Sequence, residues 1–292
     1  METFRIHFFK EKSRHVDIDL LLNYFRDEPH VETEMDETSV RFKYEHPTIF
    51  LGYQYTITPR STVPDIYRLS PNYLDVNIHI DLPILMNRYV FQQFLKSMDR
   101  FCKAFKLHPY HPLFEDVMPF KYELLSVVYH MVQSKYIQKH HEEMQSYVFL
   151  DEKVAYKMFK YEDDILELKS YYQDVSVFVP KYQLLYDGVQ LIKAIEIIDG
   201  IQTVIPPEID TIFIRLKDQS LIAYDYQKIE KKVAPLLTKV PGTIEGTHVV
   251  LKKVSNKFYK IVKKAPIKSI DTAFKSIRSR QILEREGSND IS

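Results

Sequence analysis

The sequence predicts an α+β protein, and three observations lead to that class. Residues 74 to 82 alternate apolar and polar side chains, as a strand with one buried face does. From Met86 the apolar residues take the spacing of an amphipathic helix, with Phe94 and Met98 on one stripe. Beyond Val175 the chain becomes rich in β-branched and aromatic residues. We therefore expect an N-terminal, largely antiparallel sheet with helices on one face, a helical connector and a β-rich C-terminal domain.

The first domain, residues 1–112, should contain five strands and two helices. Short alternating or β-branched runs predict its strands over Thr3 to Phe9, Val31 to Glu34, Ser39 to Tyr44, Ile49 to Thr58 and Leu74 to Leu82. Asp17 or Asp19 can start a short helix, and the proline-rich stretch 108–112 ends the long one. The hairpin-like connections predict an antiparallel sheet, because parallel strands need long crossovers.

The helical connector, residues 113–173, carries two apolar stripes. The first consists of Leu125, Val128, Tyr129, Val132 and Tyr136. The second recurs at alternating spacings of four and three residues and consists of Val154, Met158, Tyr161, Ile165, Leu168 and Tyr172. This seam is too short to indicate a coiled coil. It predicts a helix that packs on another helix, either in this chain or in a second copy, and the second case would make a homo-oligomer through the Val154 to Tyr172 helix.

The β-rich domain, residues 174–265, should begin with five strands. They are predicted over Val175 to Val179, Val189 to Ile198, Ile201 to Ile205, Ile209 to Leu216 and Leu221 to Tyr226. Asp199-Gly200 predicts a type I′ hairpin turn, and Lys217 to Ser220 a second, longer one.

The end of the chain should hold a helix around residues 227–238 and a last hairpin. The two strands of that hairpin are expected over Thr247 to Val254 and Lys257 to Val262, with Ser255-Asn256 as their turn. Residues 266–292 are polar, so we expect a loosely ordered tail, with a weakly held helix followed by disorder.

Composition argues against several classes of protein. The 292 residues hold no run of 18 uncharged apolar residues and no signal-peptide pattern, which predicts a cytoplasmic protein that does not enter a membrane. The single cysteine, Cys102, lies on an apolar helix stripe and should pack rather than react. The six glycines form no phosphate-binding loop and no nucleophile elbow. We therefore expect no nucleotide cofactor and no other cofactor.

A net charge of zero hides a strong charge asymmetry along the chain. Residues 228–280 hold twelve lysines and two arginines against three acidic residues, a net charge of +11, whereas residues 1–227 sum to −9. Such asymmetry predicts an acidic or polyanionic partner. The candidate partner-binding residues are Lys252, Lys253, Lys257, Phe258, Tyr259, Lys260, Lys263 and Lys264.

These basic residues suit either an acidic protein surface or a nucleic acid backbone. Lysines can neutralise phosphates while the two aromatic rings stack on bases. The excess of lysine over arginine argues against bidentate, sequence-specific contacts with bases. Lysine-rich strands also serve simply to protect an exposed sheet edge, and that interpretation competes with both.

One enzyme-like pattern provides an alternative. Asp75, Asn77, His79 and Asp81 occupy every second position of one strand, so they share its polar face at intervals of about 6.5 to 7 Å. Asp75, His79 and Asp81 could hold a divalent metal and serve a metal-dependent hydrolase or nuclease. The competing interpretation is the solvent face of an antiparallel sheet. No histidine or cysteine set elsewhere has the spacing of a zinc site, so no metal centre is expected.

The sequence therefore favours a non-enzymatic cytoplasmic interaction or adaptor protein. Its basic C-terminal domain should dock on an acidic partner, either a protein or a nucleic acid. The hydrolase or nuclease that uses the Asp75, His79 and Asp81 strand face is the alternative.

Overall fold

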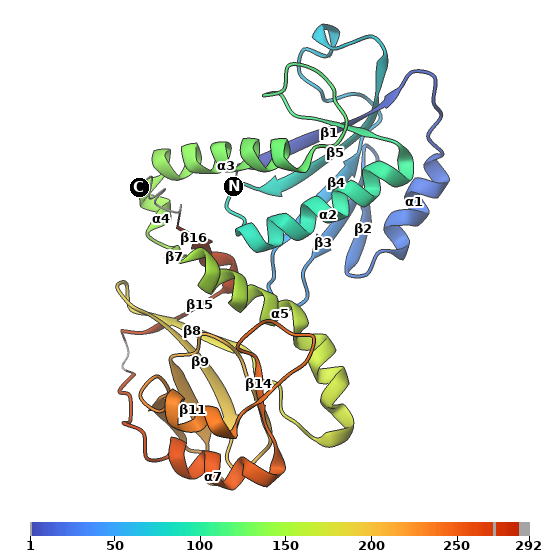
Figure 1. Cartoon of the computed structure of the whole chain (residues 1–292). Coiled ribbons are helices and arrows are strands. Elements are labelled where there is room, and N and C mark those ends of the chain that lie inside the picture. Colours follow the sequence, from blue (N-terminus) through green and yellow to red (C-terminus); the bar gives the residue numbers. More distant parts are fainter. Residues whose placement is uncertain (1, 271–272, 286–292) are drawn as a thin grey trace. The chain divides into compact units, whose positions relative to one another are not determined.

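The computed structural model describes residues 2–270 and 273–285 (Figure 1). Helices and antiparallel sheets make it an α+β protein, as predicted. The chain forms two compact units, Met1–Ser146 and Tyr147–Ser292, which we call the N-terminal and C-terminal units. The boundaries predicted at residues 112, 173 and 265 stay a prediction. Among the described residues, no helix is both long enough and apolar enough to cross a membrane.

The N-terminal unit is built on one six-stranded sheet in which every pairing is antiparallel. In spatial order the strands are β2 (Val31–Met35), β3 (Val40–Glu45), β4 (Gly52–Ile57), β5 (Tyr73–Pro83), β1 (Thr3–Glu11) and β6 (His108–Tyr110). The five predicted strands are all present, and β6 forms where the proline-rich stretch follows the long helix. The predicted antiparallel sheet is confirmed.

Two helices cover one face of this sheet, as predicted (Figure 1). They are α1 (Ile18–Asp27), whose N-cap is Asp17, and α2 (Arg88–Phe105), whose N-cap is Asn87. The Phe25 ring of α1 stacks on Phe42 of β3 with centroids 4.4 Å apart and lies 5.3 Å from Phe101 of α2. Aromatic packing therefore fixes both helices against the same side of the strands.

The remaining helices of the N-terminal unit are α3 (Tyr122–Lys139), α4 (His141–Met144) and the 3-10 turn η1 (Ile66–Arg68). The Tyr129 ring of α3 stacks on Phe91 of α2 at 3.8 Å, and its hydroxyl donates to the carbonyl oxygen of Ile84. Cys102 is buried in the core, where burial raises the pKa of its thiol and disfavours a reactive thiolate.

The described residues of the C-terminal unit form three small sheets. The five-stranded sheet has the order β12 (Leu221–Asp225), β11 (Thr211–Arg215), β9 (Leu191–Ile198), β8 (Tyr182–Tyr186) and β15 (Lys275–Ile277). The three-stranded sheet has the order β10 (Thr203–Ile205), β14 (His248–Val250) and β13 (Thr238–Lys239). Strand β16 (Ile282–Glu284) pairs in parallel with β7 (Val148–Leu150).

The α-helices of this unit are α5 (Glu152–Tyr172), α6 (Glu230–Val233) and α7 (Lys252–Val262). The 3-10 turns are η2 (Gln173–Val175), η3 (Ala234–Leu236) and η4 (Ser279–Gln281). The apolar side of α7 contributes Phe258, Tyr259 and Val262 to a core shared with β9, β11 and β12. Most of the lysines that the sequence analysis selected for partner binding therefore lie on helix α7 of this unit.

The Asp199-Gly200 hairpin prediction is wrong. Strand β9 pairs with β8 and β11, and β10 leaves to pair with β14 in the other sheet. Of the two turn residues only Gly200 has a positive φ, +80°, whereas a type I′ turn needs positive φ at both central residues. The amide of Ile201 donates to the carbonyl oxygen of Ile198 at 3.1 Å, which closes a turn with glycine at its third position. The second predicted hairpin, between β11 and β12, is confirmed.

The final hairpin predicted over residues 247–262 is also wrong. His248 to Val250 supply strand β14, but residues 252–262 form helix α7. The buried residues Ser255, Phe258, Tyr259 and Val262 recur at spacings of three and four residues, which is a helical period. Ser255-Asn256, predicted as a turn, lies inside this helix.

Three further expectations for this unit change. The helix predicted around residues 227–238 is shortened to α6 and η3, and Val175 to Val179 form only an isolated bridge from Phe178 to Thr203. Beyond Pro266 the described residues form strands β15 and β16 rather than a helix. The predicted disordered end, residues 286–292, lies outside the described residues.

The seam on α5 is covered within the chain. Tyr161, Ile165, Leu168 and Tyr172 pack with Val204 and Val249 of the three-stranded sheet in one buried cluster. The seam therefore packs on strands rather than on another helix. The seam itself is therefore covered by its own chain, and the homo-oligomer expected through the Val154 to Tyr172 helix stays a prediction.

Candidate functional site

Helix α7 and the turn that directly follows it carry six exposed lysines, which we call the lysine face: Lys252, Lys253, Lys257 and Lys260 in the helix, Lys263 at its C-cap and Lys264 just beyond. At about 100° per residue these six positions fall within an arc of about 140° around the helix axis. Lys253, Lys257, Lys260 and Lys264 follow one another at spacings of four, three and four residues, so they form a continuous stripe. The sequence-predicted lysines are thus brought together on one surface.

The positive charge of this surface is mostly unneutralised. The Lys263 ammonium lies 2.7 Å from a carboxylate oxygen of Asp199. Within residues 2–270 and 273–285, the other five lysines make no ion pair. Lys252 and Lys253 also stand in the first turn of α7, where the helix dipole disfavours cations and the N-cap residue Leu251 supplies no side-chain hydrogen bond. The arrangement therefore raises the local positive potential without stabilising the helix.

Phe258 and Tyr259 were expected to contact the partner, and the structure corrects this. Phe258 is 0% exposed and Tyr259 is 3% exposed, because both rings pack into the core beneath α7. They cannot stack on nucleic acid bases. The physical reason is the helical period of the segment, which turns Phe258 away from the lysine face and leaves Tyr259 at the edge of that face, where its ring packs into the core.

A turn at the end of β9 fixes α7 in place, and we call residues Ile198 to Gln202 the adjoining turn. The Tyr259 hydroxyl donates a hydrogen bond shared between the carbonyl oxygens of Ile198 and Ile201, at 2.8 and 2.7 Å. Ser255 donates to the carbonyl oxygen of Gly200 at 3.0 Å. The backbone amide of Lys252 donates to the Gln202 side chain at 2.9 Å. The lysine face is therefore held on a rigid support.

The second candidate site is the face of the N-terminal sheet opposite α1 and α2. Strand register places two rows of directly opposed residues there, and we call them the polar sheet face. One row is Glu32, Lys43, Gln54, Asp81 and Arg5, and the next is Glu34, Arg41, Thr56, His79 and His7. A pocket of about 710 Å³ opens on it, with Lys43, Gln54 and Asp81 in its lining.

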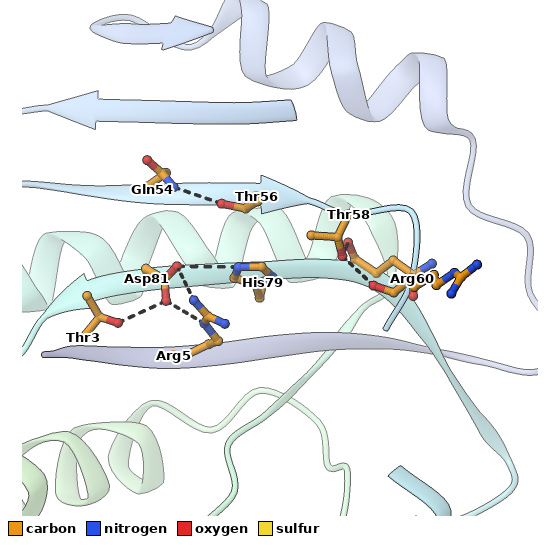
Figure 2. Close-up of polar contacts among 9 residues, drawn as sticks. Thr3, Arg5, Gln54, Thr56, Thr58, Arg60, His79 and Asp81 are labelled. Atoms are coloured by element: carbon orange, nitrogen blue, oxygen red, sulfur yellow. Dashed lines mark hydrogen bonds and ion pairs between the residues drawn. The ribbon is translucent and has the colours of Figure 1, made fainter. Parts of the chain in front are cut away.

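Asp81 is the centre of a network on this face (Figure 2). Its two carboxylate oxygens accept hydrogen bonds from Arg5 at 2.7 and 3.0 Å, and His79 Nε2 lies 3.5 Å away. Thr3 donates a longer bond of 3.3 Å. Burial alone would raise the pKa of Asp81, but the hydrogen bonds from His79 and Arg5 outweigh burial and lower that pKa to about 2. Arg5 was not singled out from the sequence, although its register opposite Asp81 makes it the main partner.

His79 faces another histidine rather than solvent. His7 lies directly opposite it on β1, and the two rings are 5.8 Å apart. The exposed fraction is 2% for His7 and 4% for His79. Burial and the neighbouring His79 lower the pKa of His7 to about 4, so His7 is neutral at physiological pH.

Asp75 does not join Asp81. Asp75 stands opposite Phe9 and Asp81 stands opposite Arg5, positions that lie about 13 Å apart along β1 at 3.3 Å per residue. The register shifts between His7 and Phe9, and Asn77 takes a positive φ of 60°, so the simple alternation is interrupted. Two carboxylates that share a divalent ion must bring oxygens within about 5 Å of each other.

The predicted residues therefore do not converge as the hydrolase alternative requires. Among the residues that the structure describes, no group of three or more histidine, cysteine, aspartate or glutamate side chains has the geometry of a metal site. The Arg5 guanidinium on Asp81 would also repel a cation. Burial raises the pKa of Asp75, which further weakens it as a ligand at low pH.

Comparison with known proteins gives no family for the chain: no family model matches it, and neither the curated proteins nor the solved structures provide a significant match. Of the two surfaces, the polar sheet face pairs its charges internally, whereas most charges of the lysine face have no ion-pair partner among the described residues.

Proposed function

We propose that the chain is a non-enzymatic cytoplasmic interaction protein that docks on an acidic partner through the lysine face of α7. The observation that carries the proposal is the set of five exposed lysines that form no ion pair with the described residues. Like charges placed on one rigid helix repel one another, and an opposite charge from outside relieves that repulsion. The net charge of +11 over residues 228–280 adds to the positive electrostatic potential around the lysine face.

The lysine face offers point charges rather than shaped contacts. It contains no arginine, so bidentate recognition of a base edge or a carboxylate is not available. Charge pairing of this kind steers association and depends strongly on salt. The proposal is therefore a fast, salt-sensitive docking interaction with little sequence discrimination.

Binding of poly-L-glutamate and of a short DNA duplex to the full chain tests this function. Replacing Lys257→Gln together with Lys260→Gln should weaken binding of the acidic probe at least about tenfold at low salt and reduce the slope of log K against log salt by one to two. The matched control replaces Lys153→Gln and Lys169→Gln, two exposed lysines of α5, and removes the same charge. The control should stay within about twofold of wild type. A wild-type chain that binds neither probe at about 50 mM salt contradicts the proposal.

A further inference from the structure

We infer that the partner of the lysine face is a protein segment that combines acidic with aliphatic or aromatic side chains, rather than a nucleic acid. This inference rests on the proposed docking function and names the class of partner. The observation that carries it is an exposed apolar pair beside the lysines: Ile198 is 42% exposed and Ile201 is 41% exposed.

The apolar pair and the lysines belong to one surface. The carbonyl oxygens of Ile198 and Ile201 accept the Tyr259 hydroxyl, and Asp199 between them pairs with Lys263. Around the axis of α7, the position of Tyr259 is separated from Lys252 by about 20° and from Lys263 by about 40°. The adjoining turn therefore borders the side of the helix where the lysine face begins.

The adjoining turn is fixed in this exposed conformation. Gly200 supplies the positive φ of +80° that the turn needs, and space for a side chain is open there. Hydrogen bonds from Ser255 and Tyr259 hold the turn from below. A rigid apolar pair loses little conformational entropy when a partner covers it.

A nucleic acid backbone does not match this combination. Phosphates would use the lysines but would leave the two isoleucines against a polar, hydrated chain. The aromatic rings that could stack on bases, Phe258 and Tyr259, are buried beneath the helix. An acidic segment with leucine or phenylalanine residues satisfies both halves of the surface, since its carboxylates meet the lysines and its apolar side chains cover the isoleucines.

The lysines alone cannot distinguish an acidic protein segment from a nucleic acid, because they attract any polyanion. The contribution of the isoleucines comes from apolar area removed from water and is insensitive to salt screening. The two halves of the surface can therefore be separated by experiment.

The test uses the full chain and three labelled probes: an acidic peptide with interspersed leucine and phenylalanine, a peptide of equal charge with serine and glycine in their place, and a DNA duplex. Wild type should bind the acidic-apolar peptide about tenfold more tightly than the acidic-polar peptide. Ile198→Gln with Ile201→Gln should remove most of that preference and change binding of the acidic-polar peptide by less than about twofold. Ile201→Gln alone should remove part of it.

Val189→Gln is the matched control for Ile201→Gln, because Val189 is 92% exposed in the loop before β9 and lies outside the adjoining turn. It should leave all three affinities unchanged. The comparison of the two peptides on wild type needs no variant and so does not depend on variant folding. Equal affinity for both peptides, or tighter binding of the duplex than of either, overturns the inference and leaves the docking function standing. If none of the probes binds, the docking function itself is contradicted.

Discussion

The polar sheet face and the lysine face both carry charged side chains at regular spacing, but they differ in where those charges are neutralised. On the sheet, Arg5 pairs with Asp81 and Lys43 pairs with Glu34 across neighbouring strands. On α7, Lys263 pairs with Asp199 and the other five lysines have no ion-pair partner among the described residues. A regular row of polar residues is therefore compatible with purely structural use, and unneutralised charge is the better indicator of a binding surface.

The largest expected effect is a difference in the free energy of unfolding between a buried and an exposed position of α7. Phe258→Ala removes a ring that is 0% exposed from the core and should lower the free energy of unfolding by about 3 to 5 kcal/mol. Lys257→Ala, at an exposed position of the same helix, should change it by less than about 0.5 kcal/mol. Urea unfolding followed by circular dichroism measures both. Similar effects of the two changes would mean that the burial of Phe258 has been assigned to the wrong side of the helix.

The next effect concerns pH and should appear on the sheet face. His7 has a pKa of about 4 in the folded state against 6.5 for the free side chain, so the folded state binds fewer protons between these values. The His7 contribution to the free energy of unfolding should therefore be fully present above pH 6.5 and be lost as pH decreases to 4, a loss of about 3 kcal/mol. His7→Gln should flatten that part of the profile. Lys257→Gln with Lys260→Gln should retain the wild-type profile, and a His7→Gln profile parallel to wild type would refute the assignment.

The sequence predicts the secondary structure of the N-terminal unit better than that of the C-terminal unit. In the N-terminal unit, the alternation of residues 74 to 82 and the short connections specify both strand and antiparallel pairing, and both are confirmed. In the C-terminal unit, Val254, Phe258 and Val262 have helical spacing, but Ser255-Asn256 resembles a turn and the β-branched composition favours strands. Local pattern was ambiguous there, and the packing of α7 on β9 and β11 decides the outcome.

The candidate residues show the same limit. All six lysines were predicted from charge, which needs no knowledge of the fold. The burial of Phe258 and Tyr259 depends on the helical period, and the role proposed for Ile198 and Ile201 depends on contacts with α7 about 60 residues away in sequence. Arg5 was missed because only strand register places it on Asp81. Long-range pairing leaves no local signal that a single sequence reveals.

A smaller effect should distinguish the ion pairs of the two surfaces. A double-mutant cycle of Arg5→Gln and Asp81→Asn should give a coupling energy of about 1 kcal/mol at pH 7, after allowance for the partial exposure of Arg5. Because the pKa of Asp81 is lowered to about 2, this coupling should be complete above pH 4 and disappear as pH falls through 2. The corresponding cycle of Lys263→Gln and Asp199→Asn should give less than about 0.5 kcal/mol. Equal couplings would remove the distinction drawn here between the two surfaces.

Chemical-shift mapping of backbone amides during titration with an acidic peptide tests most directly which of the two surfaces binds. Both surfaces are present in the same molecule, so the polar sheet face serves as an internal control. We expect concentration-dependent shifts at residues 198–202 and along α7, weakened by added salt, with Arg5, His79 and Asp81 unchanged. Shifts centred on Arg5, His79 and Asp81 while α7 stays unperturbed would contradict the assignment of the binding surface to the lysine face.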